Sequence, residues 1–377
     1  MKVLLVGNYP PDDQESMSRY ASWLSSALIA AGVDVKILKP APCFGHNKFR
    51  AWPLGKWLAY IDKFVLFPWK LIRRAQWADV VHILDHGNSM YVFYLARTPN
   101  IVTCHDLLAV RGALGMIDGL KVGKTGRLFQ FLIRQGLVHA AHVICVSQAT
   151  LSDLRSVSPR LRSTPEIIEN PLNWPYIPMS PALAWARIRR DVPGLSTKFF
   201  LHVGGNQWYK NRIGVIRIFD SLRRLSPEFE DYQLIMAGKP FDSLIEQALN
   251  AENEGHIVSL EKPPNDLLQA LYSVTEGFLF PSLAEGFGWP IIEAQACGAL
   301  VITSNRPPMD QIAGDGAILI SPDRPEEAAQ SIAQAWEKRE ELRSRSVVNA
   351  GRFSEKKAIK RYIESYKNAI AVGSHER

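Results

Sequence analysis

The sequence has few cysteines, and none of them forms a recognisable motif. The 377-residue chain holds four, Cys43, Cys104, Cys145 and Cys297, at unpaired spacings. These spacings exclude the common zinc and redox motifs and are typical of a reducing compartment. No run approaches the ~18 consecutive apolar residues of a membrane-spanning helix. The apolar run within Met1–Gly7 is too short for a signal peptide, so we expect a cytoplasmic protein without a spanning segment.

Glycine-rich phosphate loops are also lacking. Neither half carries Gly-x-Gly-x-x-Gly after its first predicted strand, and there is no Walker-type Gly-x-x-x-x-Gly-Lys-Ser/Thr loop, because the Gly-Lys-Thr at 123–125 has Asp118 in place of the first glycine. A dinucleotide dehydrogenase and a Walker-type nucleotidase are therefore disfavoured. With 47% hydrophobic and 21% charged residues, the composition is that of a globular protein and excludes disorder as the dominant state. At roughly 150 residues per domain, the length predicts two or three domains.

The net charge of +7 is unevenly distributed along the chain. Residues 1–180 hold 20 Lys and Arg against 12 Asp and Glu, whereas residues 181–377 hold 24 against 25. We therefore expect any large anionic partner to meet the first half.

Short apolar blocks recur along the chain between stretches with helical periodicity. Because their apolarity is continuous rather than alternating, they are typical of parallel strands buried on both faces. Between the first two blocks, apolar residues from Met17 to Ala31 follow helical spacing, and Gly32 supplies a stop. Strand–helix–strand units, repeated about five times per half, predict an α/β fold of two doubly wound Rossmann-like domains facing across a cleft. The blocks are Val3–Val6, Val33–Leu38, Val80–Leu84, Ile101–Cys104, Val143–Val146, Phe199–Val203, Gln233–Ala237, Ile257–Leu260, Gly277–Phe280 and Leu300–Thr303.

A proline-rich segment marks the domain boundary. Asn170–Pro181 holds four prolines, which prevent helix or sheet and indicate a semi-rigid linker. We expect an N-terminal domain over residues 1–178 and a C-terminal domain over 179–353. A final helix should start near Ser354, a plausible N-cap, and run to about Ile370.

The loop after the predicted strand Gly277–Phe280 carries the most informative segment. Proline suits the first turn of a helix, so Trp289-Pro290 predicts a helix start that forms an anion site. Two carboxylates beside such a site, Glu285 and Glu293, favour a hydroxyl-rich ligand such as ribose or hexose. The alternative is that both are ordinary solvated glutamates. The free amides would be those of Gly288, Ile291 and Ile292.

A second candidate site follows the first strand of the second half. Gly204 and Gly205 allow a ligand to approach the backbone, and Lys210 offers a cation at a helix start. Such a cation would stabilise negative charge on a departing diphosphate. A solvated lysine is the alternative.

A polar His105-Asp106 pair follows a predicted strand of the first half. We expect it to face the same cleft, although a lone histidine is more often structural.

Residues 46–77 hold seven basic residues against one acid, Asp62, together with four of the chain's ten tryptophans. Basic and aromatic residues on a helical stretch suit lipid headgroups. Nucleic acid would accept the same charge, and a solvated helix whose tryptophans pack on the sheet is the third interpretation. The basic residues are Lys48, Arg50, Lys56, Lys63, Lys70, Arg73 and Arg74, and the tryptophans are Trp52, Trp57, Trp69 and Trp77.

The segment around Glu285-Gly-Phe-Gly-Trp-Pro290, with Glu293 after it, closely resembles the signature of retaining glycosyltransferases of family four, which have the two-domain GT-B fold. The resemblance implies that Glu293 holds the nucleotide ribose and that Glu285 grips hydroxyls of the donor sugar. It also implies that the final helix, 354–377, packs back on the first domain. The implied catalytic residues are His105, Lys210 and Glu285. The implied donor-binding residues are Gly204, Gly205, Lys210, Arg212, Gly286, Phe287, Gly288, Ile292 and Glu293.

The chain departs from the family pattern in two loops. The family usually supplies an Arg beside the Lys that Lys210 matches, but Gly205 and Tyr209 stand where we would expect it. Arg212 either substitutes or points to solvent. The first loop lacks the glycine pair of many members, and three of its polar residues could serve acceptor or phosphate binding: Gln14, Ser16 and Arg19.

The resemblance implies a retaining, metal-independent enzyme without a cofactor. It would move a sugar from a nucleoside-diphosphate sugar to a hydroxyl of a glycan or glycolipid, in bacterial surface polysaccharide or lipopolysaccharide assembly. Front-face attack would leave the acceptor's proton on the leaving diphosphate. We expect no nucleic acid partner, and a peripheral position on the inner face of an anionic membrane through residues 46–77. A non-catalytic sugar-nucleotide or membrane-binding homologue and a GT-B nucleotide-sugar epimerase are the alternatives.

Overall fold

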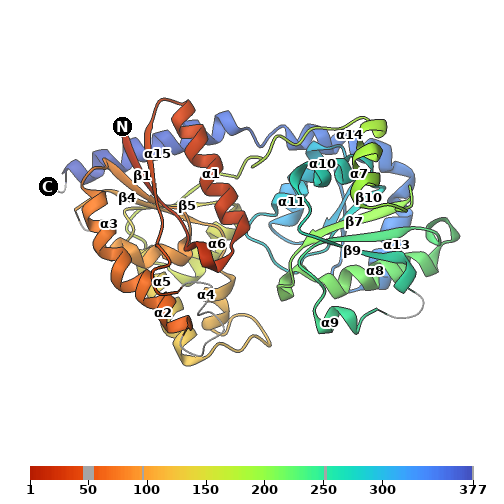
Figure 1. The fold of residues 1–377 in the computed structure, drawn as a ribbon, viewed down its shortest axis with the longest axis horizontal. Helices are drawn as coiled ribbons and strands as arrows, with labels where there is room; N and C mark the ends of the chain where they lie inside the picture. Colours follow the sequence, from red (N-terminus) through yellow and green to blue (C-terminus); the bar gives the residue numbers. More distant parts are fainter. Residues whose placement is uncertain (46–54, 96, 250–252, 376–377) are drawn as a thin grey trace. The chain divides into compact units, whose positions relative to one another are not determined.

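The computed structural model describes residues 1–45, 55–95, 97–249 and 253–375. The chain forms two compact units (Figure 1): unit 1 is Met1–Asn173 with Glu355–Arg377, and unit 2 is Trp174–Ser354. Each unit is built on a six-stranded parallel sheet with helices on both faces.

The sheet of unit 1 has the order β2-β1-β3-β4-β5-β6. The central register places Val3 of β1 opposite Val35 on one side and Val80 on the other. All neighbours are parallel, so the loops after β1, β3 and β4 leave the same edge of the sheet. The strands are β1 (Lys2–Val6), β2 (Asp34–Leu38), β3 (Val80–Ile83), β4 (Asn100–Cys104), β5 (His142–Cys145) and β6 (Glu166–Ile167).

One face of this sheet forms the main apolar core of unit 1. Strand residues such as Leu4, Val81 and Val102 pack there against Leu71 of α3 and Leu137 of α5. The opposite face is covered by α1 and α15 (Figure 1). The helical elements of unit 1 are η1 (Pro10–Asp12), α1 (Glu15–Ala30), α2 (Gly55–Ile61), η3 (Asp62–Leu66), α3 (Phe67–Ala75), η4 (His86–Tyr94), α4 (Leu108–Ala113), α5 (Lys124–His139), α6 (Gln148–Val157) and α15 (Glu355–His375).

Helix α15 packs on unit 1 through buried polar contacts. The Tyr362 hydroxyl lies 2.7 Å from the Tyr20 hydroxyl of α1, and the Tyr366 hydroxyl lies 2.8 Å from Nδ1 of His82 on β3. Nε2 of His82 lies 2.7 Å from Thr103 Oγ1 on β4. These buried groups satisfy one another, so the last helix of the chain is joined to the first sheet.

The sheet of unit 2 has the order β12-β11-β10-β7-β8-β9. β7 is central and pairs in parallel with β8 and β10, so the loops after β7 and β10 are neighbours at one edge. The strands are β7 (Phe199–Gly204), β8 (Gln233–Gly238), β9 (Ile257–Glu261), β10 (Gly277–Phe280), β11 (Val301–Ser304) and β12 (Ala317–Ile320).

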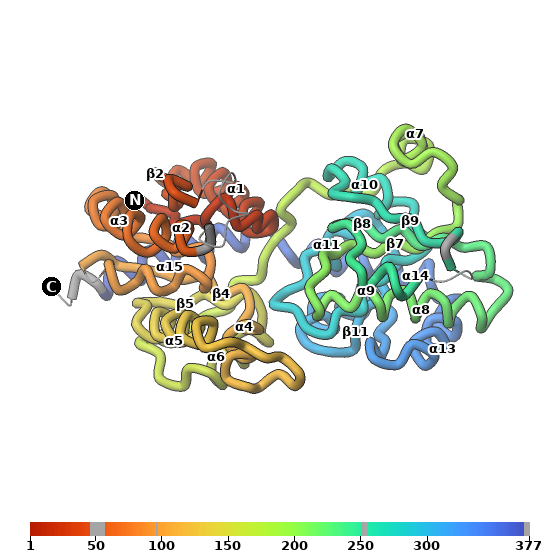
Figure 2. The backbone as a smooth tube through the Cα atoms, turned by 60° about the horizontal axis from the view of Figure 1, so that its bottom comes forward, coloured from red at the N-terminus to blue at the C-terminus, as the bar shows by residue number. Residues whose placement is uncertain are grey.

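Helices lie on both sides of this sheet, with α10 on one side and α8 and α13 on the other (Figure 2). Phe219 of α8 and Ile332 of α13 pack on Phe200 and Leu279 of the sheet. On the other face, Tyr272 of α10 packs edge-on against Phe278 of β10. The helical elements are α7 (Pro181–Asp191), η5 (Trp208–Lys210), α8 (Arg212–Leu225), η6 (Pro227–Phe229), α9 (Ser243–Glu246), η7 (Glu254–His256), α10 (Asn265–Val274), α11 (Trp289–Ala296), α12 (Met309–Ala313), α13 (Pro325–Ala335), η8 (Trp336–Lys338) and α14 (Arg339–Ala350).

The predicted α/β fold of two doubly wound domains is confirmed, and every predicted strand is present with bounds that differ by at most one residue. Two strands were missed: β6, which has two residues, and β12. The prediction of burial on both faces is wrong for β2 and β9, because each is an edge strand whose residues are largely exposed or half-exposed. The segment 168–180 contains neither helix nor strand.

Candidate functional site

The loop after β7 places Lys210 at the carboxyl edge of the unit 2 sheet. Gly204 is the last residue of β7, Gly205 follows it, and Lys210 ends the short helix η5. Asn211, in the left-handed region at φ 55°, then redirects the chain into α8.

Backbone and side-chain bonds fix this loop to the loop after β10. The Leu283 amide donates to the Tyr209 carbonyl at 2.7 Å, and the Asn211 side chain donates to the Pro281 carbonyl at 2.9 Å. The Lys210 ammonium consequently donates to Oε1 of Glu285 at 2.7 Å. Side-chain exposure of 17% for Lys210 and 8% for Glu285 makes this a partly desolvated ion pair. The solvated alternative is therefore wrong for both residues.

Helix α11 begins at Trp289, as predicted. Its N-cap Gly288 has φ 99°, which a side chain rarely adopts, so glycine is required at this turn. Gly286 lies in the preceding loop, and the Phe287 ring is buried against Phe353 at a centroid distance of 5.7 Å.

One predicted free amide of this helix is already engaged. The Ile291 amide donates to the Gly288 carbonyl at 3.0 Å, so that part of the expected anion site is corrected. The tight turn at Gly288 closes this bond. Ile292 is fully buried.

Glu293 lies within the first two turns of α11 and is 4% exposed, so it is no solvated glutamate. The Tyr272 hydroxyl donates to its Oε2 at 3.3 Å. Burial, together with the Glu293 carboxylate, raises the pKa of Tyr272 well above its usual value, so this donor stays protonated.

Arg212 does not point to solvent. It is 3% exposed, and its Nη1 donates to the Lys239 carbonyl at 3.0 Å and to the Asn206 side chain. Its guanidinium also lies 5.1 Å from the Phe241 ring centroid. Nε and Nη2 are buried without a hydrogen-bond partner among the described residues. Arg212 therefore joins the loops after β7 and β8.

In unit 1, His105 follows β4 and is 7% exposed. Its Nε2 lies 2.9 Å from the Leu84 carbonyl, which only accepts, so Nε2 carries the proton. The Tyr20 ring meets it edge-on at 4.8 Å. Burial lowers the pKa of His105, which favours the neutral imidazole. Asp106 accepts from the Leu108 amide at 3.0 Å, so it orients the loop at the start of α4.

The sequence analysis missed a second pair, Asp85-His86, which follows β3. Nδ1 of His86 lies 3.2 Å from Oδ1 of Asp85, and Asn8 after β1 donates to Oδ2 of Asp85 at 2.5 Å. Burial acts to lower the pKa of His86, but Asp85 outweighs it and raises that pKa. The same pair interaction holds the pKa of Asp85 well below its usual value. The signal was present, because a polar Asp-His after a buried strand is the criterion that selected His105-Asp106.

The polar residues of the first loop are largely engaged with their neighbours. Gln14 accepts from the Asn8 side chain, and Arg19 pairs with Glu15 one helical turn away at 2.5 Å. Ser16 is exposed on the first turn of α1.

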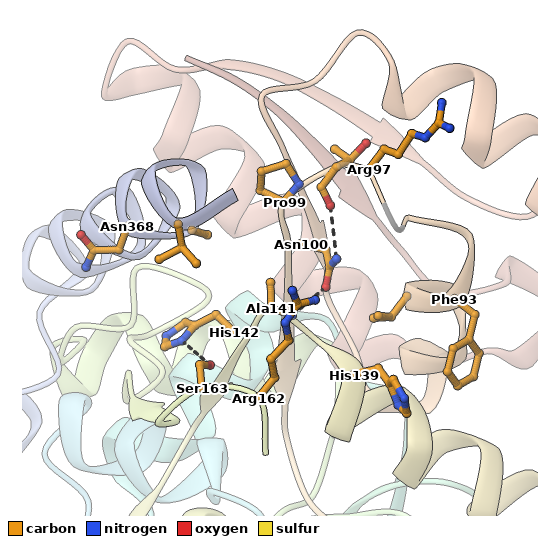
Figure 3. Close-up of a pocket in the computed structure, with 14 residues that line it drawn as sticks. Phe93, Arg97, Pro99, Asn100, His139, Ala141, His142, Arg162, Ser163 and Asn368 are labelled. Atoms are coloured by element: carbon orange, nitrogen blue, oxygen red, sulfur yellow. Dashed lines mark hydrogen bonds between the residues drawn. The ribbon is translucent and has the colours of Figure 1, made fainter. Parts of the chain in front are cut away.

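A hollow of about 750 Å³ lies at the opposite edge of the unit 1 sheet, beside the residues that begin β4 and β5 (Figure 3). Asn100 donates to the Thr98 carbonyl at 3.2 Å and accepts from the Ala141 amide at 3.1 Å. Nδ1 of His142 lies 3.3 Å from Ser163 Oγ. Because these polar groups satisfy one another, we place no candidate site here.

The basic segment forms the consecutive elements α2, η3 and α3. Asp62 is buried and accepts from the Tyr9 hydroxyl at 2.8 Å, so its carboxylate does not face the surface. Trp57 and Trp69 are 58% and 68% exposed, so the interpretation that the tryptophans pack on the sheet is wrong for these two. Trp77 does pack against the core. Part of the prediction lies outside the described residues: Lys48, Arg50, Trp52 and the side chain of Lys56.

The described ranges contain no group of three or more His, Cys, Asp or Glu side chains arranged to hold a metal ion. No helix in them combines the length and the apolar character that crossing a bilayer requires.

Comparisons with known proteins match both units. A family model described as Glycosyltransferase Family 4 matches residues 17–173, and one described as Glycosyl transferases group 1 matches residues 188–352.

Curated relatives and solved structures agree with these models. O-antigen chain mannosyltransferase B of Escherichia coli is 28% identical over 334 residues, 83% of each chain. GDP-mannose:cellobiosyl-diphosphopolyprenol alpha-mannosyltransferase of Xanthomonas oryzae pv. oryzae is 27% identical over 78% of this chain and 75% of its own. Sucrose-phosphate synthase from Thermosynechococcus elongatus superposes with a TM-score of 0.77 at 19% identity, over 99% of this chain and 100% of its own. The chain is a glycosyltransferase that belongs to family 4, group 1, and has the GT-B fold.

Proposed function

We propose that the protein is a retaining, metal-independent mannosyltransferase that uses GDP-mannose and extends a glycan or lipid-linked acceptor in bacterial surface polysaccharide assembly. The choice of mannose and GDP follows the names of its relatives. The observation that carries the proposal is the Lys210–Glu285 pair at the adjoining ends of β7 and β10.

Lys210 is proposed to hold the donor diphosphate. Its ammonium has three N–H donors, so it can keep its bond to Glu285 while it donates to phosphate oxygens. Charge grows on the diphosphate as the glycosidic bond breaks, and a fixed cation at that point lowers the barrier. A Cβ at Gly204 or Gly205 would collide with the side chain of His202 or Gln207, so both positions favour glycine.

The carboxylates are proposed to hold hydroxyl groups of the donor. Glu285, with the backbone of Gly286, Phe287 and Gly288, would bind the transferred sugar. Glu293 would bind the ribose. An ionised carboxylate has about four acceptor positions, so Glu285 and Glu293 can keep their bonds to Lys210 and Tyr272 while they accept from hydroxyl groups.

Unit 1 is proposed to bind the acceptor. Asp85 and Asp106 supply two negative charges, whereas of the two histidines only His86 has a raised pKa that favours its positive form. The excess of negative charge suits neutral hydroxyl groups better than phosphate. His105 would contact the reacting sugar. We further propose that the protein works in the cytoplasm at the inner membrane face, with α2, η3 and α3 toward anionic lipid.

Nucleotide binding tests the donor assignment. A thermal-shift series with GDP and UDP should favour GDP, since a ligand at 100 times its Kd adds about 2.7 kcal/mol. Hydrolysis of GDP-mannose in the presence of EDTA should persist in the native chain and be lost in Glu285→Ala. In the transfer reaction, NMR of the glycosylated acceptor should show an α-mannosidic linkage.

The other outcomes identify the alternatives. GDP binding without turnover would indicate a non-catalytic homologue. Formation of a free epimeric sugar would indicate an epimerase. An inverted anomer would refute retention.

A further inference from the structure

The edge strand β2 and helix α3 enclose a hollow of about 450 Å³ in unit 1. It lies on the core side of the sheet edge, away from the loops that carry His86 and His105. Four cations line it, and no carboxylate does. The charged and aromatic lining residues are Lys36, Lys70, Arg73, Arg74 and Trp77.

Helix geometry accounts for this concentration of charge. Lys70, Arg73 and Arg74 are spaced three and four residues apart, which places them on one face of α3. Lys36 reaches the same hollow from β2, and its ammonium lies 3.9 Å from the Trp77 ring centroid. The Trp77 ring thus holds one cation in place beside the other three.

These four charges have no carboxylate partner in the part of the chain that the structure describes. Across the described residues, none of the four forms an ion pair, whereas neighbouring Lys63 pairs with Asp12 at 2.5 Å. Asp62, the one acid of the segment, is buried. Like charges around one hollow repel each other, and an anion that entered it would relieve this repulsion.

Exposed apolar side chains flank the hollow on the same helical stretch. Val65 and Ile72 are 53% and 41% exposed, and Trp69 is 68% exposed. Such side chains gain by leaving water for the acyl boundary of a bilayer, with tryptophan at the headgroup level. Nucleic acid carries phosphate but offers no such apolar phase.

We propose that the hollow between β2 and α3 binds the phosphate headgroup of an anionic phospholipid, with Lys36, Lys70, Arg73 and Arg74 around the phosphate and Trp69 and Ile72 in the adjoining lipid. The inference rests on the membrane part of the proposed function and is independent of sugar transfer. It replaces a diffuse basic surface with a defined headgroup-binding site, which includes Lys36 from outside the 46–77 segment.

Vesicle flotation of the full chain tests this site. Vesicles of phosphatidylcholine with about one third phosphatidylglycerol should float the native protein at low salt, and phosphatidylcholine alone should not. Lys36→Ser/Arg73→Ser should weaken binding by about tenfold to thirtyfold, the factor for two basic residues at a charged surface. The matched control, Arg155→Ser/Arg160→Ser, removes two exposed charges elsewhere in unit 1 and should bind as the native protein does.

Each outcome decides a separate point. If the native protein fails to float, both the headgroup site and the membrane partner are wrong. Equal losses in the two double variants would leave a diffuse basic surface and overturn the hollow. Arg73→Lys, which keeps the charge, should bind almost normally. The thermal midpoint of each variant would reveal a folding defect.

Soluble probes distinguish the sources of phosphate. Tryptophan fluorescence should change on addition of anionic vesicles and hardly change with glycerol phosphate or inorganic phosphate. Comparison with Trp77→Phe identifies the part of the change that comes from Trp77. Saturation by free phosphate at lower concentration than by lipid would identify a soluble ligand instead. Displacement from vesicles by a short RNA at physiological salt would assign the hollow to nucleic acid.

Discussion

At the scale of single residues, the sugar-transfer chemistry proposed for unit 2 centres on two side chains that are in contact. Lys210 and Glu285 are 75 positions apart in the chain, yet the bonded loops after β7 and β10 place them at 2.7 Å. The pair is held in a partly desolvated position, where electrostatic effects on a reacting diphosphate are stronger than in water.

Lys210→Ala should lower kcat with GDP-mannose by about a hundredfold, because removing a donor to a developing charge costs roughly 3 kcal/mol. GDP binding should weaken less than turnover, which calorimetry would measure. Lys210→Arg keeps the charge and serves as the control. Near-normal turnover in Lys210→Ala would remove this residue from the mechanism.

The two glutamates should differ in their kinetic effects. Glu293→Gln should mainly raise KM for the donor, since a ribose contact is equally present in the ground and transition states. Glu285→Gln should mainly lower kcat, because contacts to the sugar ring change as its anomeric carbon becomes cationic. Steady-state kinetics with GDP-mannose separate the two, and identical pure KM defects would disprove this division of roles.

At the scale of elements, side chains at the start of helices hold the loops of the site. Arg212 at the start of α8 joins the loops after β7 and β8, and Asn211 joins the loops after β7 and β10. The loops after β7, β8 and β10 are thus bonded to one another rather than three independent turns.

Arg212→Ala should lower the free energy of unfolding by about 2 kcal/mol, since a buried charged hydrogen bond is lost. It should also weaken GDP binding, because the loop after β7 loses its bond to Lys239. Arg212→Lys keeps the charge but not the planar fork, so partial recovery is expected. Thermal midpoints and GDP calorimetry measure the two effects. A lower midpoint with unchanged GDP affinity would show that Arg212 only supports the fold and does not replace the missing family arginine.

At the scale of the whole molecule, His82 in unit 1 and His202 in unit 2 are both fully buried and favour the neutral form. Burial lowers the pKa of His82 in unit 1 and of His202 in unit 2 to about 3, from 6.5. Nδ1 of His202 donates to the Leu279 carbonyl, and its Nε2 is buried without a hydrogen-bond partner among the described residues, so protonation there would add an unsatisfied N–H. At acid pH the unfolded chain therefore binds more protons than the fold.

The contribution of these two histidines to the free energy of unfolding should be fully present above their unfolded pKa of 6.5. It should fall as the pH decreases toward their folded pKa of about 3. Each histidine contributes at most about 1.4 kcal/mol per pH unit over that window. Thermal midpoints between about pH 7.5 and about pH 5 measure the decline. His202→Asn keeps a donor for the Leu279 carbonyl but does not titrate, so its acid decline should be shallower. An unchanged decline would show that His202 does not titrate on unfolding.

Much of this architecture was predictable because parallel strands leave a strong local signal. Continuous apolar blocks such as Val143–Val146 located their strands to within one residue, since a strand covered on both faces must be apolar throughout. β12 is equally apolar, Ala317-Ile-Leu-Ile320, so the same signal was present there and was missed. The helix start at Trp289-Pro290 followed from proline chemistry, and Glu285 and Lys210 from polar groups after buried strands.

The fold class and the residue types at the loop ends could be predicted from the chain alone, because they depend on short-range patterns, and the family was inferred from the resemblance of the segment around Glu285 and Glu293. The tertiary structure alone decided which distant residues meet. It paired Lys210 with Glu285, buried Arg212 between two loops, and brought Lys36 of β2 to the cations of α3. It also turned Trp69 outward and Asp62 inward within one helical segment. The physical reason is that ion pairing, burial and pKa depend on neighbours far away in the chain, whose positions are set only when the sheets assemble.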